Sequence, residues 1–139
     1  MKFMRQSTGV TLIELVLTIV VISFGLIGVM ILFENATRGV MQADLNVMAT
    51  NLAHEKLEQI ILDKWRDGYA SVIDTGYPDE NFQDEFSIFT RSTDIVEVSG
   101  SDLATQEADS GYKRVDVTVL WGGGSLQRIS LSTLLASYK

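Results

Sequence analysis

Two chemically distinctive features lie close together near the N-terminus. Gly9 precedes a long apolar stretch, and one carboxylate, Glu14, lies within that stretch about one helical turn from its start. A charged side chain in the middle of a membrane span costs on the order of 2.5–3.5 kcal/mol, so such a group usually has a partner. Cleavage after Gly9 would give Val10 a new α-amino group, four residues before Glu14. That amine is a natural partner for the carboxylate, within one chain or on a neighbouring one.

No other group of residues predicts a catalytic or metal site. His54 is the only histidine, and with Glu55 and Glu58 beside it on a helix it supplies too few ligands for zinc. One histidine without a strained serine turn also gives no nucleophilic triad. We therefore expect a protein that is not an enzyme, with no catalytic residues, no metal and no cofactor.

An acidic cluster and a glycine run have simpler interpretations. The cluster contains Asp79, Glu80, Asp84 and Glu85. Its spacing lacks the calcium-binding pattern of an EF-hand, which favours a solvated loop over a calcium site. The run 122–124 is followed by neither a lysine nor a helix, so it predicts a turn and not a phosphate loop. Trp121, Tyr112 and Tyr138 are expected in the core or in subunit contacts.

The apolar stretch predicts a membrane-spanning helix. No charged residue occurs from Leu15 to Phe33, close to the roughly 20 residues that a bilayer core requires. A segment in lipid must pair its own backbone groups, so residues 10–33 should be helical. The segment 1–9 carries Lys2 and Arg5 and no acid, which predicts a cytoplasmic leader and an exported C-terminal part.

Composition limits the rest of the protein. The chain has 139 residues and a formal charge of −7, which becomes −9 without the two cations of the leader. An acidic surface without a basic cluster argues against nucleic-acid binding. The sequence has no cysteine, so an exported domain must rely on packing or on other subunits. Its length allows one small globular domain beyond the helix.

Beyond Phe33 the helix is expected to continue as an amphipathic one. Apolar residues recur at three- and four-residue spacing over 34–66, without a proline, and Gly39 is a possible bend. We expect one helix from Val10 to about Trp65, roughly 80 Å long at 1.5 Å per residue. Gly68 is placed to terminate it.

The segment 67–139 predicts a small β-rich domain. A polar connection, 70–85, precedes strands at 86–91 and 94–98, with a kink between them, and a polar loop at 99–111. Two strands, 113–121 and 127–135, then alternate apolar and polar residues around the glycine turn and form a C-terminal hairpin. The fold class is α+β: a long N-terminal helix packed on a small antiparallel sheet of about three strands.

At its N-terminus the sequence resembles the type IV pilin and pseudopilin family. The resemblance rests on the basic leader, Gly9, the run from Val10 to Leu15 with Glu14, and the apolar helix. It implies cleavage between Gly9 and Val10 by prepilin peptidase, N-methylation of Val10, and a role for Glu14 in assembly. It also implies that the subunit lies first in the lipid of the bacterial inner membrane. An assembly platform in that membrane would then move it from the lipid into a cell-surface or periplasmic filament. There it would join other pilin or pseudopilin subunits.

A looser resemblance concerns the segments 53–60 and 119–121, which are similar to minor pilins of the PilV type and I-type pseudopilins. It implies a minor subunit with an assembly, priming or tip role. The span lacks the proline and the C-terminus the cysteine pair common among major pilins. Two alternatives remain: a pseudopilin of a type II secretion system, and a signal-anchored exported binding domain that never polymerises and keeps its Gly9–Val10 bond. A cleaved secretory signal fits less well, since the apolar run is long and the glycine precedes it.

Overall fold

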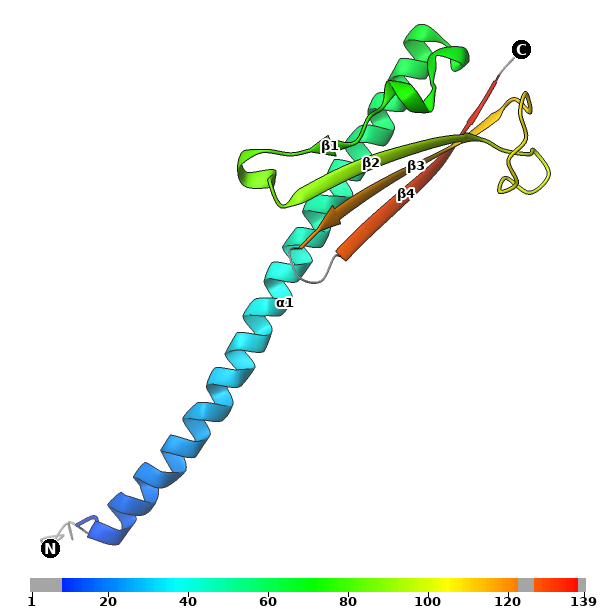
Figure 1. The fold of residues 1–139 in the computed structure, drawn as a ribbon. Helices are drawn as coiled ribbons and strands as arrows, with labels where there is room; N and C mark the ends of the chain where they lie inside the picture. Colours follow the sequence, from blue (N-terminus) through cyan, green and yellow to red (C-terminus); the bar gives the residue numbers. More distant parts are fainter. Residues whose placement is uncertain (1–8, 123–126, 138–139) are drawn as a thin grey trace, which may run out of the picture. The chain divides into compact units, whose positions relative to one another are not determined.

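The structure is a computed structural model that describes residues 9–122 and 127–137; the other residues of the expected leader, 1–8, lie outside it. Its main elements are α1 (Leu12–Asp67), β1 (Glu80–Asn81), β2 (Phe89–Glu97), β3 (Tyr112–Trp121) and β4 (Gln127–Ala136). The expected α+β class is confirmed, with four strands instead of about three (Figure 1). By internal contacts the chain divides into two units, Met1–Gln42 and Ala43–Lys139.

In the first unit, the side chains of α1 are not covered by the chain. Every large apolar residue from Val10 to Phe33 is exposed, from 47% at Val20 to 83% at Leu12. The hydroxyls of Thr18 and Ser23 donate hydrogen bonds to carbonyls one turn earlier, so the helix satisfies them itself. The helix is long and apolar enough to cross a membrane, and it runs through residue 39 without a break.

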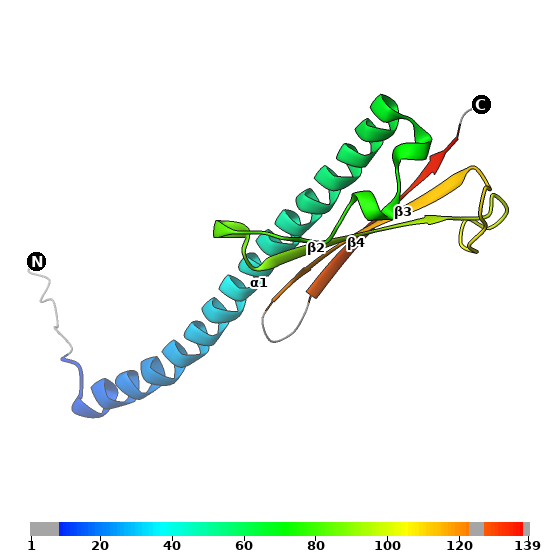
Figure 2. The same ribbon diagram turned by 45° about the horizontal axis from the view of Figure 1, so that its top comes forward.

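In the second unit, α1 is amphipathic and covers the sheet. Its buried residues recur every three or four positions: Ala49, Leu52, Ala53, Lys56, Leu57 and Ile60. Both views show these last turns of α1 alongside one face of the sheet (Figure 2). The helix ends at Asp67, and Gly68 follows with φ +92°, its N–H donating to the carbonyl of Lys64 at 3.0 Å. The predicted glycine terminus is therefore confirmed.

The four strands form one antiparallel sheet in the order β1-β2-β3-β4. The expected hairpin is present: β3 and β4 pair without a bulge from Tyr112 opposite Ala136 to Trp121 opposite Gln127. Alternate residues of β3 are buried against α1: Val115, Val117, Val119 and Trp121. Phe89 of β2 packs on Trp121 in this core, with ring centroids 6.1 Å apart.

Two sequence predictions for the region before β3 are wrong. The two kinked strands are one continuous strand, β2, and Phe86 lies in a 3₁₀ turn (Asp84–Phe86) before it. The alternation of β2 continues across the expected kink, because Arg91 and Thr93 are both buried. The expected polar connection before β2 contains the short strand β1 and buries Val72 and Tyr77.

Candidate functional site

The start of α1 places the expected processing and assembly residues within about one turn. Thr11 is the N-cap: its Oγ1 accepts a hydrogen bond from the N–H of Glu14 at 3.3 Å, and its carbonyl accepts one from Leu15 at 3.1 Å. Glu14 therefore occupies the third helical position of a Thr-x-x-Glu capping sequence. This role of Thr11 was not predicted, although the Thr-x-x-Glu spacing is typical of a capping sequence.

Glu14 has no intrachain partner for its charge within the part of the chain that the structure describes. Its carbonyl accepts a 2.5 Å hydrogen bond from Thr18, but no described cation or donor reaches its carboxylate. The first turn of a helix favours a negative charge in water. The same carboxylate in an apolar environment requires a counter-charge, which the described chain does not supply.

The fold does not explain why residue 9 is a glycine. Gly9 and Val10 precede the helix and are exposed, Val10 by 71%. A Cβ built on Gly9 meets nothing within 4 Å, and its φ lies outside the left-handed region that favours glycine. A side chain is therefore compatible with the described structure at this position, and no described residue requires a glycine there.

Small and polar residues lie on the same side of α1 as Glu14. At 3.6 residues per turn, Thr11, Thr18, Gly25 and Gly28 fall within roughly 100° of one another around the helix, with Glu14 among them. A Cβ on either glycine meets no atom within 4 Å. A glycine inside a helix costs about 0.5–1 kcal/mol relative to alanine, and no contact within the described chain explains these two. Thr11, Glu14, Thr18, Gly25 and Gly28 are called the seam below.

The buried charges of the second unit, in contrast, are partnered within the chain. The side chains of Lys56 and Arg91 are each only 5% exposed and share the carboxylate of Glu80, at 2.5 Å from Lys56 Nζ and 2.6 Å from Arg91 Nε. Arg91 also donates to the carbonyl of Leu52 in α1. Burial raises the pKa of Glu80, but the hydrogen bonds and charges of the two cations outweigh it and bring the pKa below its ordinary value. This cluster ties α1, β1 and β2 together.

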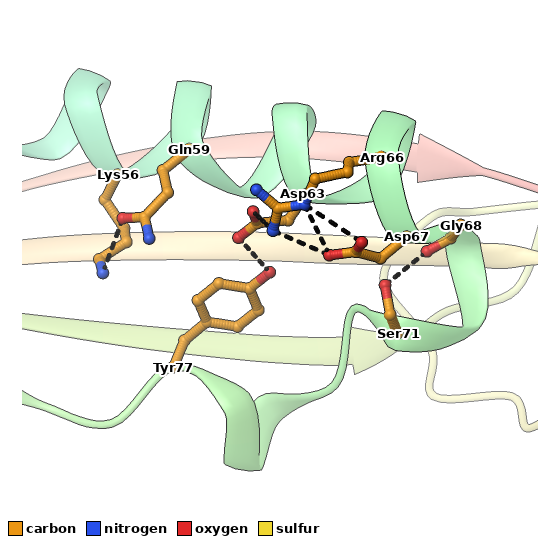
Figure 3. A network of polar contacts seen from close by, with 8 residues as sticks. All are labelled: Lys56, Gln59, Asp63, Arg66, Asp67, Gly68, Ser71 and Tyr77. Carbon is orange, nitrogen blue, oxygen red and sulfur yellow. Dashed lines mark hydrogen bonds and ion pairs between the residues drawn. The ribbon is translucent and has the colours of Figure 1, made fainter.

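A second polar network closes the end of α1. Figure 3 shows Asp63 between Tyr77 and Arg66, with the tyrosine hydroxyl 3.0 Å and the guanidinium 2.7 Å from its carboxylate. Arg66 also binds Asp67. Burial and the hydrogen bond to Asp63 raise the pKa of Tyr77 to about 12. The groups of this network satisfy one another, so it is structural.

The remaining candidates are placed as follows. His54 lies 3.3 Å from Glu58 on the exposed side of α1, and no three potential metal ligands converge among the described residues. The prediction of a solvated acidic loop is wrong for Glu80, because its carboxylate is paired with Lys56 and Arg91. Trp121 is in the core, whereas Tyr112 is exposed. Tyr138 and most of the glycine turn lie outside the described residues.

Comparisons of the chain with protein-family models, with curated proteins and with solved structures gave no match.

Proposed function

We propose that the protein is a minor type IV pilin, cut between Gly9 and Val10, methylated on Val10 and incorporated into a pilus-type filament. One observation supports this most directly. An apolar helix that none of the described residues covers carries one carboxylate with no partner among those residues, about one turn after an exposed Gly9. An assembly of similar helices would supply both the cover and the counter-charge.

The proposed mechanism replaces lipid by protein around α1. Before assembly, residues 10–33 lie in the membrane with the carboxylate of Glu14 near one end of the span. On assembly the helix enters a bundle of like subunits, and Glu14 meets the methylated amine of Val10 on a neighbour. An ion pair in a low-dielectric environment is favourable only with good geometry on both sides, so it sets the axial register of the subunits.

The seam supports the same proposal. Small residues let helices approach closely in membranes, where association depends on packing and hydrogen bonds. Gly25 and Gly28 would let a neighbouring helix approach on the side that carries Glu14. The close contact and the ion pair would therefore form on one side of α1.

Intact mass spectrometry of the protein recovered from membranes tests the processing step. We expect a chain that begins at Val10 with one added methyl group, in cells with an active prepilin peptidase. Gly9→Leu should block the cut without unfolding the chain, because the space around Gly9 is open. An intact N-terminus in such cells would contradict the proposal and favour the signal-anchored binding domain.

The assembly step is tested by Glu14→Leu with Glu34→Leu as its control. Glu34 is also an exposed glutamate of α1, but it pairs with Arg38 at 2.6 Å. We expect Glu14→Leu to abolish incorporation into sedimentable filaments and Glu34→Leu to retain it. Equal incorporation of the two variants would show that Glu14 does not set the register.

Cysteine cross-linking tests the seam, since the chain has no cysteine of its own. Gly25→Cys places a thiol on the seam, and Ile27→Cys places one on the opposite side of the helix, about 160° away at 3.6 residues per turn. We expect disulfide-linked dimers from Gly25→Cys only. Equal cross-linking at both positions would argue against a preferred side.

A further inference from the structure

The two edges of the sheet differ in how their backbone groups are satisfied. β1 and β2 form one side of the sheet and β4 the opposite edge, in the order β1-β2-β3-β4 (Figure 1). In an antiparallel sheet the N–H and C=O of one residue point to one neighbouring strand, and those of the next residue point to the opposite side. An edge strand therefore leaves the backbone groups of alternate residues without a strand partner.

The chain itself binds much of the backbone on the side of β2 that faces away from β3. β1 pairs with the start of β2, around Arg91. Further along, Ile95 donates its N–H to the carboxylate of Asp74 at 3.0 Å, and the carbonyl of Glu97 accepts the N–H of Glu107 at 3.1 Å. β1 has only two residues, fewer than the roughly 3–10 usual for a strand, so it offers little room for another strand.

β4, in contrast, is open on its outer side. Ser137, directly after the strand, donates its N–H to the carbonyl of Gly111 at 2.8 Å, and alternation from that bond directs the odd-numbered residues of β4 to β3. The even-numbered residues therefore point their N–H and C=O groups away from the sheet: Arg128, Ser130, Ser132, Leu134 and Ala136. None of the described residues bonds to these backbone groups, which are called the open edge below.

The open edge lacks the features that usually prevent strand addition, which are prolines, lysines, bulges and short length. β4 has ten residues, contains neither a proline nor a lysine, and pairs with β3 without a bulge. On the side of α1, Ile129 and Leu131 are only half-buried, whereas Ser130 and Ser132 are exposed on the other face. A strand with the same alternation of apolar and polar residues would extend both faces.

Charge favours a different protein over a second copy of the chain as the occupant. Arg128 is the only charged residue of β4, it is exposed, and no described carboxylate pairs with it. β4 of a second copy has no acid to place opposite Arg128. The other strands of a second copy do not fit either, because β2 and β3 lie inside the sheet and Glu80 of the short β1 is already bound to Lys56 and Arg91.

We propose that the open edge accepts an extended segment of a different subunit, apolar on the side of α1 and with a carboxylate opposite Arg128. Main-chain hydrogen bonds supply the affinity of such a contact, and alternate side chains supply its specificity. In naming a subunit as the source of the segment, the inference rests on the proposed function. The open edge itself belongs to the second unit and does not depend on the seam or on Glu14.

Hydrogen exchange of the full chain in detergent micelles, followed by NMR, tests the open edge. The probe is a synthetic peptide of about ten residues that alternates valine and threonine and carries one glutamate. We expect the peptide, at about 1 mM, to slow the exchange of the open-edge amides. The amide of Ile95 is the internal control, since Asp74 already binds it. No slowing at the open edge would overturn the proposal, and slowing that grows with protein concentration without peptide would assign the edge to a second copy instead.

Ser132→Pro removes one donor of the open edge, and Ser132→Ala is its matched control. The N–H of Ser132 points away from β3, so a proline there leaves the pairing of β3 and β4 in place. Both variants lose the hydroxyl that donates to Asp116. We expect Ser132→Pro to weaken peptide binding about tenfold and Ser132→Ala to leave it unchanged. Equal binding by the two variants would overturn the proposal.

Charge exchange tests Arg128 in a variant that keeps every backbone donor. Arg128→Glu should weaken binding of the glutamate peptide about fivefold, and a peptide with lysine in place of the glutamate should recover the loss. Preference of both proteins for the same peptide would overturn the role of Arg128. Filament incorporation without peptide binding would leave the proposed function standing, and peptide binding by a chain that keeps its Gly9–Val10 bond would leave only the open edge.

Discussion

The two units of the chain differ in whether their charged side chains at apolar positions have partners among the described residues. In the second unit, Lys56 and Arg91 are buried, and Glu80 lies between them with a hydrogen bond to each. In the first unit, Glu14 lies on an apolar helix, and none of the described residues pairs with its carboxylate. The second unit therefore satisfies its costly charge within the chain, whereas no described residue offsets the charge of Glu14 in the first unit.

The same contrast holds for apolar surface. Ile60 of α1 is fully buried against the sheet, while Ile19 of the same helix is 57% exposed. Burial of an isoleucine contributes about 1.5–3 kcal/mol, so Ile60 stabilises the fold. Ile19 contributes nothing of this kind within the described chain, and its apolar surface is available to lipid or to another subunit. One helix thus combines a part that stabilises the domain with a part whose apolar side chains no described residue covers.

The largest expected effect comes from removing the half-buried carboxylate of Glu80, which pairs with two buried cations. Glu80→Ala leaves the cations of Lys56 and Arg91 buried without their counter-charge, which typically costs 3–5 kcal/mol. Chemical denaturation of the full chain in micelles, followed by the fluorescence of the buried Trp121, measures the loss. Glu14→Leu should leave the same transition unchanged, because Glu14 is an exposed residue of the first unit and is not part of the core around Trp121.

The matched control for Glu80→Ala is Glu34→Ala. Glu34 forms an exposed ion pair with Arg38, with side-chain exposures of 62% and 74%. Exposed pairs of this kind contribute about 0.3–0.5 kcal/mol on a helix. Equal transitions for Glu80→Ala and Glu34→Ala would mean that the buried cluster is not held as the structure has it.

Truncation of the two isoleucines should have a smaller but clear effect. Ile60→Ala creates a cavity between α1 and the sheet and should destabilise the second unit by about 2–5 kcal/mol. Ile19→Ala should leave its unfolding transition in place. Urea titration monitored at Trp121 measures both variants. If Ile19→Ala shifted the midpoint as far as Ile60→Ala, the first unit would be contributing to the stability of the core.

The pH dependence of stability should show a smaller contribution from Glu80. Its pKa in the folded protein lies below the ordinary value of 4.5, so its ionised form stabilises the fold above that value. This contribution is lost as the pH falls through the lowered pKa. We expect the wild type to lose its stability advantage over Glu80→Gln as the pH falls below 4.5 and through the lowered pKa. Parallel curves for the two proteins over this range would contradict the assignment.

Regular periodicity made much of the fold predictable. The helix, its end at Gly68 and both strands of the hairpin follow from local spacing, and the structure confirms them. The inward side of β4 follows from the same alternation, with Leu135 buried. These features were predictable because they depend on neighbours in the sequence.

Features that depend on distant residues were missed. β1 has two residues and no strand pattern, and it is defined by pairing with β2. Glu80 was read as solvated because Lys56 and Arg91, which bind it, are 24 and 11 residues away. Arg91 did not suggest an inward side, since a buried cation is recognised only with its partner. At the candidate site, Gly9, Val10 and Glu14 were predicted from local sequence, and their proposed partner lies outside the chain.

The smallest expected effect concerns the helix start. Thr11→Ala removes the acceptor for the N–H of Glu14 and should lower the free energy of opening at this end by about 1 kcal/mol. Hydrogen exchange of the Glu14 amide in micelles should become about fivefold faster. Thr37→Ala is the control, because the Thr37 hydroxyl donates to the carbonyl of Phe33 and accepts no N–H in the helix. Thr11 also lies after the proposed cut, so the effect should persist in the processed chain. Unchanged exchange in Thr11→Ala would mean that the cap does not hold Glu14 in place, and only the proposed neighbouring subunit would then be left to position its carboxylate.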